Sequence, residues 1–458
     1  MNSVLVLDVV GMTPELLAHT PRLQEVAASG WQAPLETVLP AVTCTVQSTF
    51  VTGSHPAEHG AVANGWYFRD LGEIYLWRQH NRLVQGEKVW ETARRTRPEL
   101  TVANVCWWYA MGASTDYTVT PRPIYHADGR KSPDCYTRPP ELHDELTAEL
   151  GPFPLFQYWG PTASLASSEW IVQATRRLMP RNDLTLAYVP HLDYDLQRHG
   201  PNSPQAARAA AEVDRVLTPL LDDAWEQGVT VVALSEYGIT RAERPVHVNR
   251  ILREAGFLEV YVQAGMEYLD PWASRAFAVA DHQVAHVYVR DAEDLQPVAS
   301  LLGGVTGVDQ VLDRAGQAEA GLDHERSGEL VLVAEQDAWF TYYYWLSDDH
   351  APDFARGVEI HRKPGFDPAE LFFDPDDPRA KLKAGLNLVK KRAGLRYAMN
   401  VVPTDPRWVG GTHGRLPADP QQGPVLLCSD PSSKRSRIGA VDVRDLILDH
   451  LGASPEQT

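Results

Sequence analysis

Four short segments of the chain combine side chains that could act together on a charged substrate. They carry hydroxyl, carboxylate, amide and imidazole groups, which are the parts of a metal-assisted nucleophilic displacement, because a bound divalent metal makes a hydroxyl nucleophilic. Taken singly, each segment also has an ordinary structural interpretation, such as a helix cap or a turn. The segments are Asp8, residues 40–65 (PAVTCTVQSTFVTGSHPAEHGAVANG), residues 187–201 (AYVPHLDYDLQRHGP) with residues 233–239 (ALSEYGI), and residues 410–414 (GGTHG).

Together, and in this order, the segments resemble the alkaline phosphatase superfamily, and within it the nucleotide pyrophosphatase/phosphodiesterase (type I phosphodiesterase) branch. The most specific part lies around Thr43, which is followed by Val-Thr-Gly at 51–53, by His-Pro-x-x-His-Gly at 55–60 and by Asn64. The resemblance implies that Thr43 is the nucleophile and that Asn64 donates hydrogen bonds to the phosphoryl oxygens. It implies an alkaline phosphatase-like fold.

The resemblance also implies two divalent metal ions, with zinc as the expected metal. One family ligand set is Asp, Thr, Asp and His, and the other is Asp, His and His. Here the family sequence Ser-Asp-His-Gly is replaced by Ser-Glu-Tyr-Gly at 235–238. The implied ligands are Asp8, Thr43, Glu236 and Tyr237 for one ion, and Asp193, Gln197 and His413 for the other. Because Gln and Tyr replace two imidazoles, the set is richer in oxygen, and Mn²⁺ or Mg²⁺ are the alternatives.

Residues 187–201, the third motif, can be aligned with the family pattern in two ways. Asp193 with Gln197 keeps both flanks free of gaps, whereas a shift of two residues gives Asp195 with His199 and retains a histidine. We favour the first pair for its ungapped flanks.

Substrate contacts are expected from a long segment before the last motif. Residues 348–375 concentrate ionisable groups, and we predict that His361, Arg362 and Lys363 bind an anionic substrate there. Nucleotide-cleaving relatives carry an aromatic residue after the nucleophile, but this chain has Cys44, which leaves Trp66, Tyr67 and Phe68 as candidates for stacking. His282 and His286 are predicted to lie on a polar edge strand.

The pattern of strands and helices around these groups indicates an α/β protein. Short continuous apolar runs indicate strands of a sheet covered on both faces, and helical patterns alternate with them. In a doubly wound, mostly parallel sheet, functional groups follow the carboxyl ends of the strands, where Asp8, Asp193 and Glu236 would lie. The predicted strands are Val4–Val10, Thr101–Trp107, Leu184–Val189 and Val229–Leu234, and the predicted helices are Glu87–Thr96, Ser167–Leu178 and Pro204–Gln227.

Two regions are expected. Residues 1–250 and 380–458 form the alkaline phosphatase-like catalytic core, and residues 251–379 form a smaller α+β part. That part holds predicted strands at Phe277–Val289, Val308–Leu312 and Glu329–Val333, and a long ordered loop at Trp345–Pro378 near the site.

Composition argues against several classes of partner and site. With 42 basic and 60 acidic residues the formal charge is −18, so a nucleic-acid polymer is not expected as partner. Four dispersed cysteines argue against a zinc knuckle or a disulfide framework. No apolar run is long enough to span a membrane, and a cytoplasmic location is expected.

The predicted function is a metal-dependent hydrolase of phosphodiester or pyrophosphate bonds that forms a phospho-enzyme at Thr43, with a small anionic, phosphate-containing substrate. Two alternatives stay open. The same fold could act on a phosphomonoester or phosphonate, or the replaced ligands could leave a catalytically degenerate binding protein.

Overall fold

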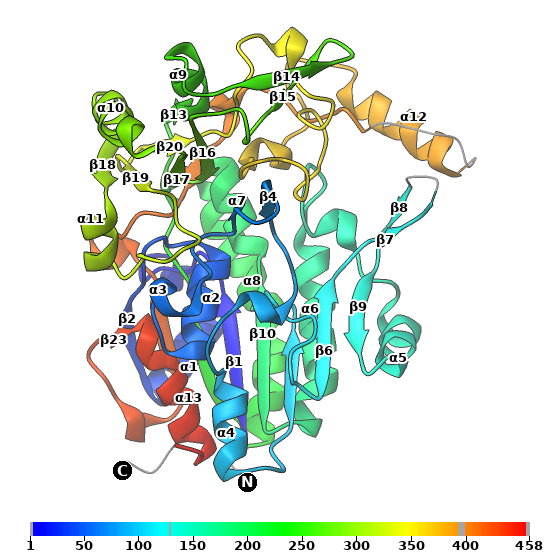
Figure 1. Ribbon diagram of the computed structural model, residues 1–458. Coiled ribbons are helices and arrows are strands. Elements are labelled where there is room, and N and C mark those ends of the chain that lie inside the picture. Colours follow the sequence, from blue (N-terminus) through cyan, green and yellow to red (C-terminus); the bar gives the residue numbers. More distant parts are fainter. Residues whose placement is uncertain (1–2, 128–129, 393–398, 455–458) are drawn as a thin grey trace. The chain divides into compact units, whose positions relative to one another are not determined.

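The computed structural model describes residues 3–127, 130–392 and 399–454, and the chain divides into two compact units (Figure 1). Unit 1 comprises Met1–Ala61, Gln79–Ile239 and Leu416–Thr458, and unit 2 comprises Val62–Arg78 and Thr240–Arg415.

Unit 1 is built on a nine-stranded sheet whose central strands run parallel, as predicted. The strand order is β23-β2-β22-β11-β1-β10-β5-β6-β9. β11, β1, β10, β5 and β6 are parallel neighbours, while β22 and β9 pair antiparallel with theirs. The strands are β1 (Val4–Val9), β2 (Trp31–Glu36), β5 (Val102–Val105), β6 (Tyr117–Pro121), β9 (Cys135–Arg138), β10 (Leu184–Val189), β11 (Thr230–Leu234), β22 (Val425–Cys428) and β23 (Ile438–Gly439).

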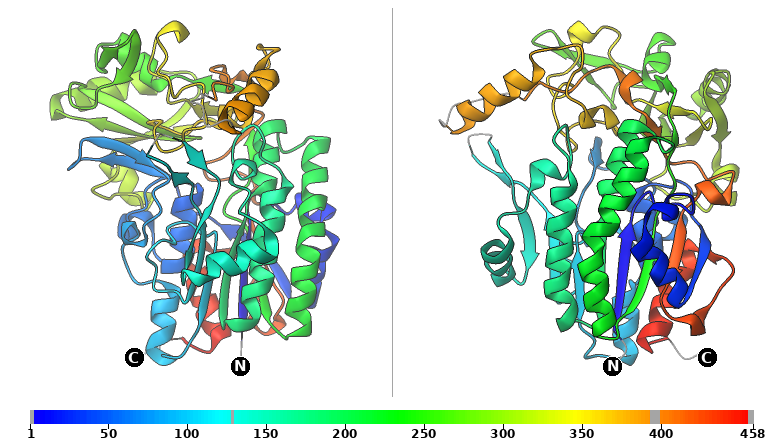
Figure 2. Two further views of the ribbon diagram at one scale, coloured as in Figure 1. Left: turned by 90° about the vertical axis from the view of Figure 1, so that its right-hand side faces the viewer. Right: turned by 180° about the vertical axis from the view of Figure 1, so that it is seen from behind.

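Helices cover both faces of this sheet, which explains why its strands read as unbroken apolar runs. On β1, Leu5 and Leu7 pack into one apolar core with α1, α6 and α8, whereas Val4 and Val6 pack into another with α2, α4 and α13. Figure 2 shows α6 and α8 side by side along one face. The helices of unit 1 are α1 (Pro21–Ser29), α2 (Thr43–Thr52), α3 (Pro56–His59), α4 (Val89–Thr96), α5 (Glu141–Leu150), α6 (Leu165–Leu178), α7 (His191–His199), α8 (Pro204–Glu226) and α13 (Val443–Leu451).

Unit 2 centres on a four-stranded antiparallel sheet of order β16-β17-β19-β18. Its strands are β16 (Ala276–Asp281), β17 (Val284–Val289), β18 (Val308–Leu312) and β19 (Leu330–Ala334), with hairpins β3 (Gly65–Phe68)–β4 (Glu73–Leu76) and β14 (Val260–Gln263)–β15 (Met266–Leu269). Short pairs are β12 (Thr240–Arg241) with β21 (Gly411–Thr412), and β13 (Arg244–Val246) with β20 (Ala338–Phe340). The helices are α9 (Val248–Glu254), α10 (Ala292–Gly303), α11 (Arg314–Glu319) and α12 (Ala380–Arg392).

Unit 2 differs from the sequence-based expectations in one strand and in its boundaries. The single strand predicted at Phe277–Val289 is a tight hairpin, because His282 adopts a positive φ of 57° and reverses the chain between β16 and β17. The division into units also differs from the predicted boundaries at 250 and 380, since β12 and β13 pair with β21 and β20 inside unit 2. The segment 345–378 contains only short 3-10 turns between its irregular stretches, as expected of a long ordered loop.

Across the part of the chain that the structure describes, no helix combines the length and the apolar character needed to cross a bilayer.

Candidate active site

Thr43 is the first residue of α2. Val42 before it is extended, with φ −133° and ψ 153°, so the helix begins at Thr43 itself. All ten residues of α2 are buried. The amino end of a helix presents backbone N–H groups and a partial positive charge, which suits an anionic group next to the Thr43 hydroxyl.

The Thr43 hydroxyl is held by two groups that follow β11. Oγ1 of Thr43 lies 3.0 Å from the phenolic oxygen of Tyr237, and Thr43 also hydrogen-bonds the Glu236 carboxyl. The Tyr237 hydroxyl donates a hydrogen bond to Oδ1 of Asp193 at 3.5 Å. Tyr237 therefore links the predicted nucleophile to a third carboxyl.

Three carboxyl groups gather where neighbouring parallel strands end. Asp8 is near the end of β1, Glu236 follows β11, and Asp193 lies in the first turn of α7 after β10. All three are buried. Burial raises the pKa of Asp8 and of Asp193 to about 7 and the pKa of Glu236 well above its usual range. The predicted position at the carboxyl edge of the sheet is thus observed for the three acids.

Gln47 connects two of these acids and was not foreseen. Its Nε2 donates to Oδ2 of Asp8 at 3.1 Å and to Oε1 of Glu236 at 2.7 Å. The backbone N–H of Trp108 donates to Oε1 of Gln47 at 2.7 Å, which fixes the orientation of the amide. Gln47 lies four residues after Thr43, so it occupies the same face of α2 one turn on. That spacing was the available sequence signal.

The two alignments of the third motif lead to different surroundings. Gln197 and Asp193 are both buried, and Nε2 of Gln197 donates to Oδ2 of Asp193 at 2.9 Å. Asp195 instead pairs with Arg198 at 3.1 Å, and His199 is exposed. Asp193 and Gln197 thus form the buried pair, and their role as metal ligands stays a prediction.

The donor set of unit 1 fits a hard, oxygen-preferring cation. Asp8 Oδ1, Glu236 Oε2 and Gln197 Oε1 are buried and have no hydrogen-bond partner among the described residues. Buried carboxylates need a cation or a proton, and these oxygens are the free ligand atoms. The acids do not form one tight centre, because the single group of three His, Cys, Asp or Glu ligand atoms within 4.8 Å of one another in the described ranges is Asp134, Cys135 and His143.

In unit 2, the predicted Asn64 and His413 belong to one buried group. The backbone N–H and Nδ2 of Asn64 donate to the two carboxyl oxygens of Asp281, at 2.8 and 3.1 Å. Asp281 also contacts Nδ1 of His282 at 2.8 Å, and the His282 ring packs at 3.7 Å between centroids on His413. Asp281 and His282 were not predicted as site residues.

The predicted polar edge strand for His282 and His286 is wrong. Both side chains are buried, His282 lies in the hairpin turn, and β17, which carries His286, is an inner strand. His286 Nε2 lies 3.0 Å from the carbonyl of Val62.

The three residues predicted to bind an anion do not converge. Lys363 is buried and forms ion pairs of 2.9 Å with both Asp367 and Glu370. This is a structural role, so we correct the anion-binding assignment of Lys363. Arg362 is largely exposed, 3.9 Å from Glu359, and His361 Nδ1 lies 3.3 Å from the Leu76 carbonyl.

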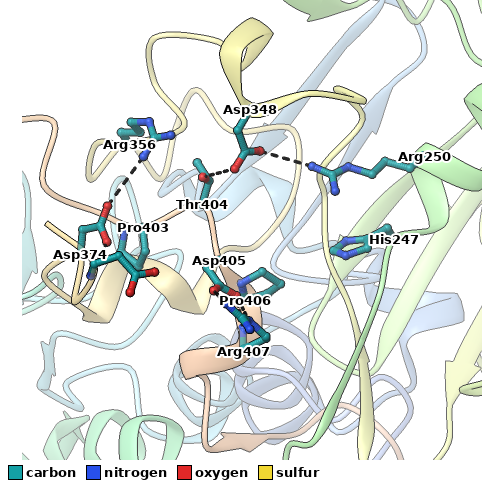
Figure 3. A pocket seen from close by; sticks show the side chains of 11 residues that line it. His247, Arg250, Asp348, Arg356, Asp374, Pro403, Thr404, Asp405, Pro406 and Arg407 are labelled. Atoms are coloured by element: carbon teal, nitrogen blue, oxygen red, sulfur yellow. Dashed lines mark hydrogen bonds and ion pairs between the residues drawn. The ribbon is translucent and has the colours of Figure 1, made fainter.

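The long loop instead contributes to a charged pocket of about 440 Å³ in unit 2 (Figure 3). Its cations are already partnered: Arg250 lies 3.5 Å from Asp348, Arg356 lies 3.7 Å from Asp374, and Arg407 pairs with Asp405. The remaining lining residues are His247, Asp376, Pro403, Thr404 and Pro406.

The candidate stacking residues are mostly enclosed. Trp66 is buried, stacks on Phe68 with ring centroids 5.2 Å apart, and is covered by the Arg326 guanidinium. Tyr67 packs edge-on against Phe277 and Tyr288. Cys44 is buried in α2.

Comparisons with known proteins agree with this architecture. Residues 4–367 match the sequence profile of the family described as type I phosphodiesterase / nucleotide pyrophosphatase. Phosphonoacetate hydrolase from Sinorhizobium meliloti, in complex with phosphonoformate, is similar with a TM-score of 0.62 at 16% identity, covering 99% of this chain and 95% of that chain. Murine ectonucleotide pyrophosphatase/phosphodiesterase 5, an inactive threonine-to-alanine variant in complex with AMP, is similar with a TM-score of 0.58 at 15% identity, covering 99% and 96%. The human protein of the same name gives 0.59 at 14% identity, with 99% and 96% covered.

Proposed function

Because the chain belongs to the type I phosphodiesterase / nucleotide pyrophosphatase family, a family of hydrolases, we propose that it cleaves phosphodiester or pyrophosphate bonds with Thr43 as the nucleophile. The observation that carries the proposal is the position of the Thr43 hydroxyl at the start of α2, in contact with Tyr237 and Glu236 and beside the buried carboxyl cluster. The murine neighbour, inactive as a threonine-to-alanine variant, is consistent with such a role.

In the proposed reaction, Oγ1 of Thr43 attacks phosphorus, the bond from phosphorus to the leaving oxygen breaks, and a phospho-threonine remains. Glu236, which is hydrogen-bonded to Thr43, is placed to take the hydroxyl proton. The N–H groups at the start of α2 stabilise the negative charge that develops on the phosphoryl oxygens. Water then cleaves the phospho-threonine and restores the hydroxyl.

Divalent metal would be held by two groups of oxygens in unit 1. Asp8 and Glu236 form the first with Thr43 and Tyr237, and Asp193 with Gln197 forms the second. When bound, the metal supplies charge stabilisation and lowers the pKa of the nucleophilic hydroxyl. Because Gln197 and Tyr237 stand where the family has imidazoles, the oxygen-rich ligand set favours Mn²⁺ or Mg²⁺ over Zn²⁺.

The roles of Asn64 and His413 remain predictions from the family resemblance. Asp281 holds both nitrogen atoms of Asn64 in place, so the amide is oriented before any ligand arrives. Such preorganisation suits a hydrogen-bond donor to a phosphoryl oxygen.

One observation favours a second candidate, a phosphonate or phosphomonoester substrate. Cys44 follows the nucleophile, has no ring and is buried, and Trp66 is enclosed, so the usual base-stacking position is lost. The similar phosphonoacetate hydrolase was captured with phosphonoformate, a small anion without a base.

Elemental analysis of the purified protein, followed by turnover assays with Mg²⁺, Mn²⁺ and Zn²⁺, tests these proposals. Cleavage of bis-(p-nitrophenyl) phosphate supports the diesterase. Cleavage of p-nitrophenyl phosphate or phosphonoacetate alone supports the second candidate. Absence of both stoichiometric metal and turnover would favour a degenerate binding protein.

A further inference from the structure

Helix α12 in unit 2 exposes an apolar stripe. Leu382, Leu386 and Val389 lie at positions i, i+4 and i+7, so they share one face of the helix. They are 62%, 55% and 63% exposed, respectively. On the opposite face, Ala380 is buried and Ala384 is half-buried. A surface helix normally exposes its polar face, so the exposed apolar stripe of α12 is unusual.

Basic side chains flank this stripe on both sides. Lys381 and Lys390 are exposed about a quarter-turn to either side of it, and Lys383 is exposed beside Lys390 while also reaching Asp377. Residues 379–392 hold six Lys or Arg and no Asp or Glu, in a chain with a formal charge of −18. Positive charge is thus concentrated on a helix that presents Leu382, Leu386 and Val389 to water. Figures 1 and 2 show α12 extending outward from the rest of unit 2.

We propose that α12 adsorbs to the surface of an anionic phospholipid bilayer, with Leu382, Leu386 and Val389 inserted at the headgroup level and the flanking lysines on lipid phosphates. An interfacial helix needs an apolar face, cationic edges and low overall hydrophobicity, and α12 has all three. Lysine side chains suit the edges because their apolar stems lie along the bilayer while the ammonium groups stay in water.

Charge complementarity favours an anionic bilayer over other occupants. The chain as a whole repels anions, so only a strongly basic segment can bring it to an anionic surface. A helix-binding groove of a protein would cover a narrow apolar stripe, but it would give no reason for cations along both edges and no acid among fourteen residues. The proposal does not depend on the chemistry at Thr43, and failure of either leaves the other intact.

Co-sedimentation of the full chain with vesicles tests the proposal. We expect binding to phosphatidylcholine vesicles that contain roughly 30% phosphatidylglycerol and weak binding to phosphatidylcholine alone. Raising NaCl from ~0.1 M to ~0.5 M should weaken binding because salt screens the lysines. Lys381→Glu and Lys390→Glu should each reduce affinity by about fivefold or more, since each removes an attraction and adds a repulsion.

Matched variants separate the helix from the rest of the surface. Val389→Ser should weaken binding severalfold, whereas Val262→Ser, at an equally exposed valine (63%) in β14, should not. Lys434→Glu with Arg437→Glu makes twice the charge change of either single variant, at exposed residues of unit 1, and should also leave binding unchanged. Circular dichroism confirms that each variant is folded.

A second measurement tests directly whether the apolar stripe enters the bilayer. The four native cysteines are buried, so Leu386→Cys would add an accessible thiol for an environment-sensitive dye, whose emission should shift to the blue with the anionic vesicles. Equal binding to neutral and anionic vesicles, no binding to either, or self-association that Val389→Ser abolishes without lipid would each overturn the proposal, the last by making the stripe a protein interface.

Discussion

The phenolic oxygen of Tyr237 lies 3.0 Å from Oγ1 of Thr43, where the family sequence carries a histidine two residues after its serine. A phenol donates or accepts a single hydrogen bond to a hydroxyl, whereas an imidazole binds a metal through nitrogen. The substitution therefore puts a phenol, in place of an imidazole, in direct contact with the predicted nucleophile. The consequences can be measured.

Removing the Thr43 hydroxyl should abolish turnover. Thr43→Ala is expected to lower kcat by roughly 10³-fold or more, because the variant lacks the oxygen that attacks phosphorus. Thr43→Ser keeps the oxygen and should retain partial activity. Steady-state assays on whichever ester the wild type cleaves decide the matter, and full activity of the alanine variant would refute the assignment.

Tyr237→Phe removes one hydroxyl and keeps the ring in its buried site. We expect kcat to fall by about 10- to 100-fold with little change in KM, since the lost contact orients the nucleophile rather than the substrate. Thermal unfolding of the variant should stay close to wild type. An unchanged kcat would show that the contact between Tyr237 and Thr43 has no part in turnover.

Restoring the two missing imidazoles should change metal preference. Gln197→His with Tyr237→His adds nitrogen donors beside Asp193 and Thr43, so Zn²⁺ affinity should rise by at least about tenfold relative to Mg²⁺. Isothermal titration with each metal measures the ratio. His199→Ala serves as the control, because His199 is exposed and paired with neither acid. A change caused by His199→Ala and not by the double variant would overturn the alignment through Asp193.

The buried acids predict how stability depends on pH. Burial raises the pKa of Asp8 and of Asp193 from 3.8 to about 7. Between these values the folded metal-free chain binds more protons than the unfolded chain, so its free energy of unfolding should fall as the pH rises from 3.8 to about 7. Unfolding by urea at a series of pH values measures this.

Metal should reverse this trend, because a cation binds the ionised carboxylates. Added Mn²⁺ should therefore raise Tm more at about pH 8 than at about pH 5. Asp8→Asn with Asp193→Asn should reduce the pH slope, leaving the part that comes from Glu236, and should remove the effect of Mn²⁺. A stabilisation by Mn²⁺ that is equal at both pH values, or that persists in the double variant, would place metal elsewhere.

Lys363 is expected to matter for folding. Lys363→Ala leaves Asp367 and Glu370 buried without their cation, which should cost about 3–5 kcal/mol of unfolding free energy. Arg362→Ala, next in sequence but largely exposed, should change it by less than about 0.5 kcal/mol. Urea denaturation of the pair compares them. Similar small losses would indicate that the Lys363 ion pairs are exchanged for water.

Much of the site could be predicted from local sequence. The four predicted apolar strands are adjacent in the sheet, as β11-β1-β10-β5, because a sheet buried on both faces imposes continuous apolar runs. Asp8 and Glu236 could be placed at its carboxyl edge for the same reason. Asp193 could be placed at the same edge, because it lies in the first turn of the helix that follows β10. These features depend on a few neighbouring residues and on the general rules of parallel sheets.

Other features depended on contacts between distant residues. Gln47 meets Glu236 across 189 positions, and Asn64 meets Asp281 across 217. Whether Lys363 faced solvent or two buried acids also had no local signature, since burial is set by everything that packs around a side chain.

The sequence by itself thus determined the family, the nucleophile candidate and the parallel core. Each follows from short motifs or apolar runs that can be interpreted without knowing how distant segments pack. Only the tertiary structure decided which partners hold those groups, which charged residues are internal, and that Leu382, Leu386 and Val389 of α12 are exposed, because these are results of packing between segments far apart in the chain.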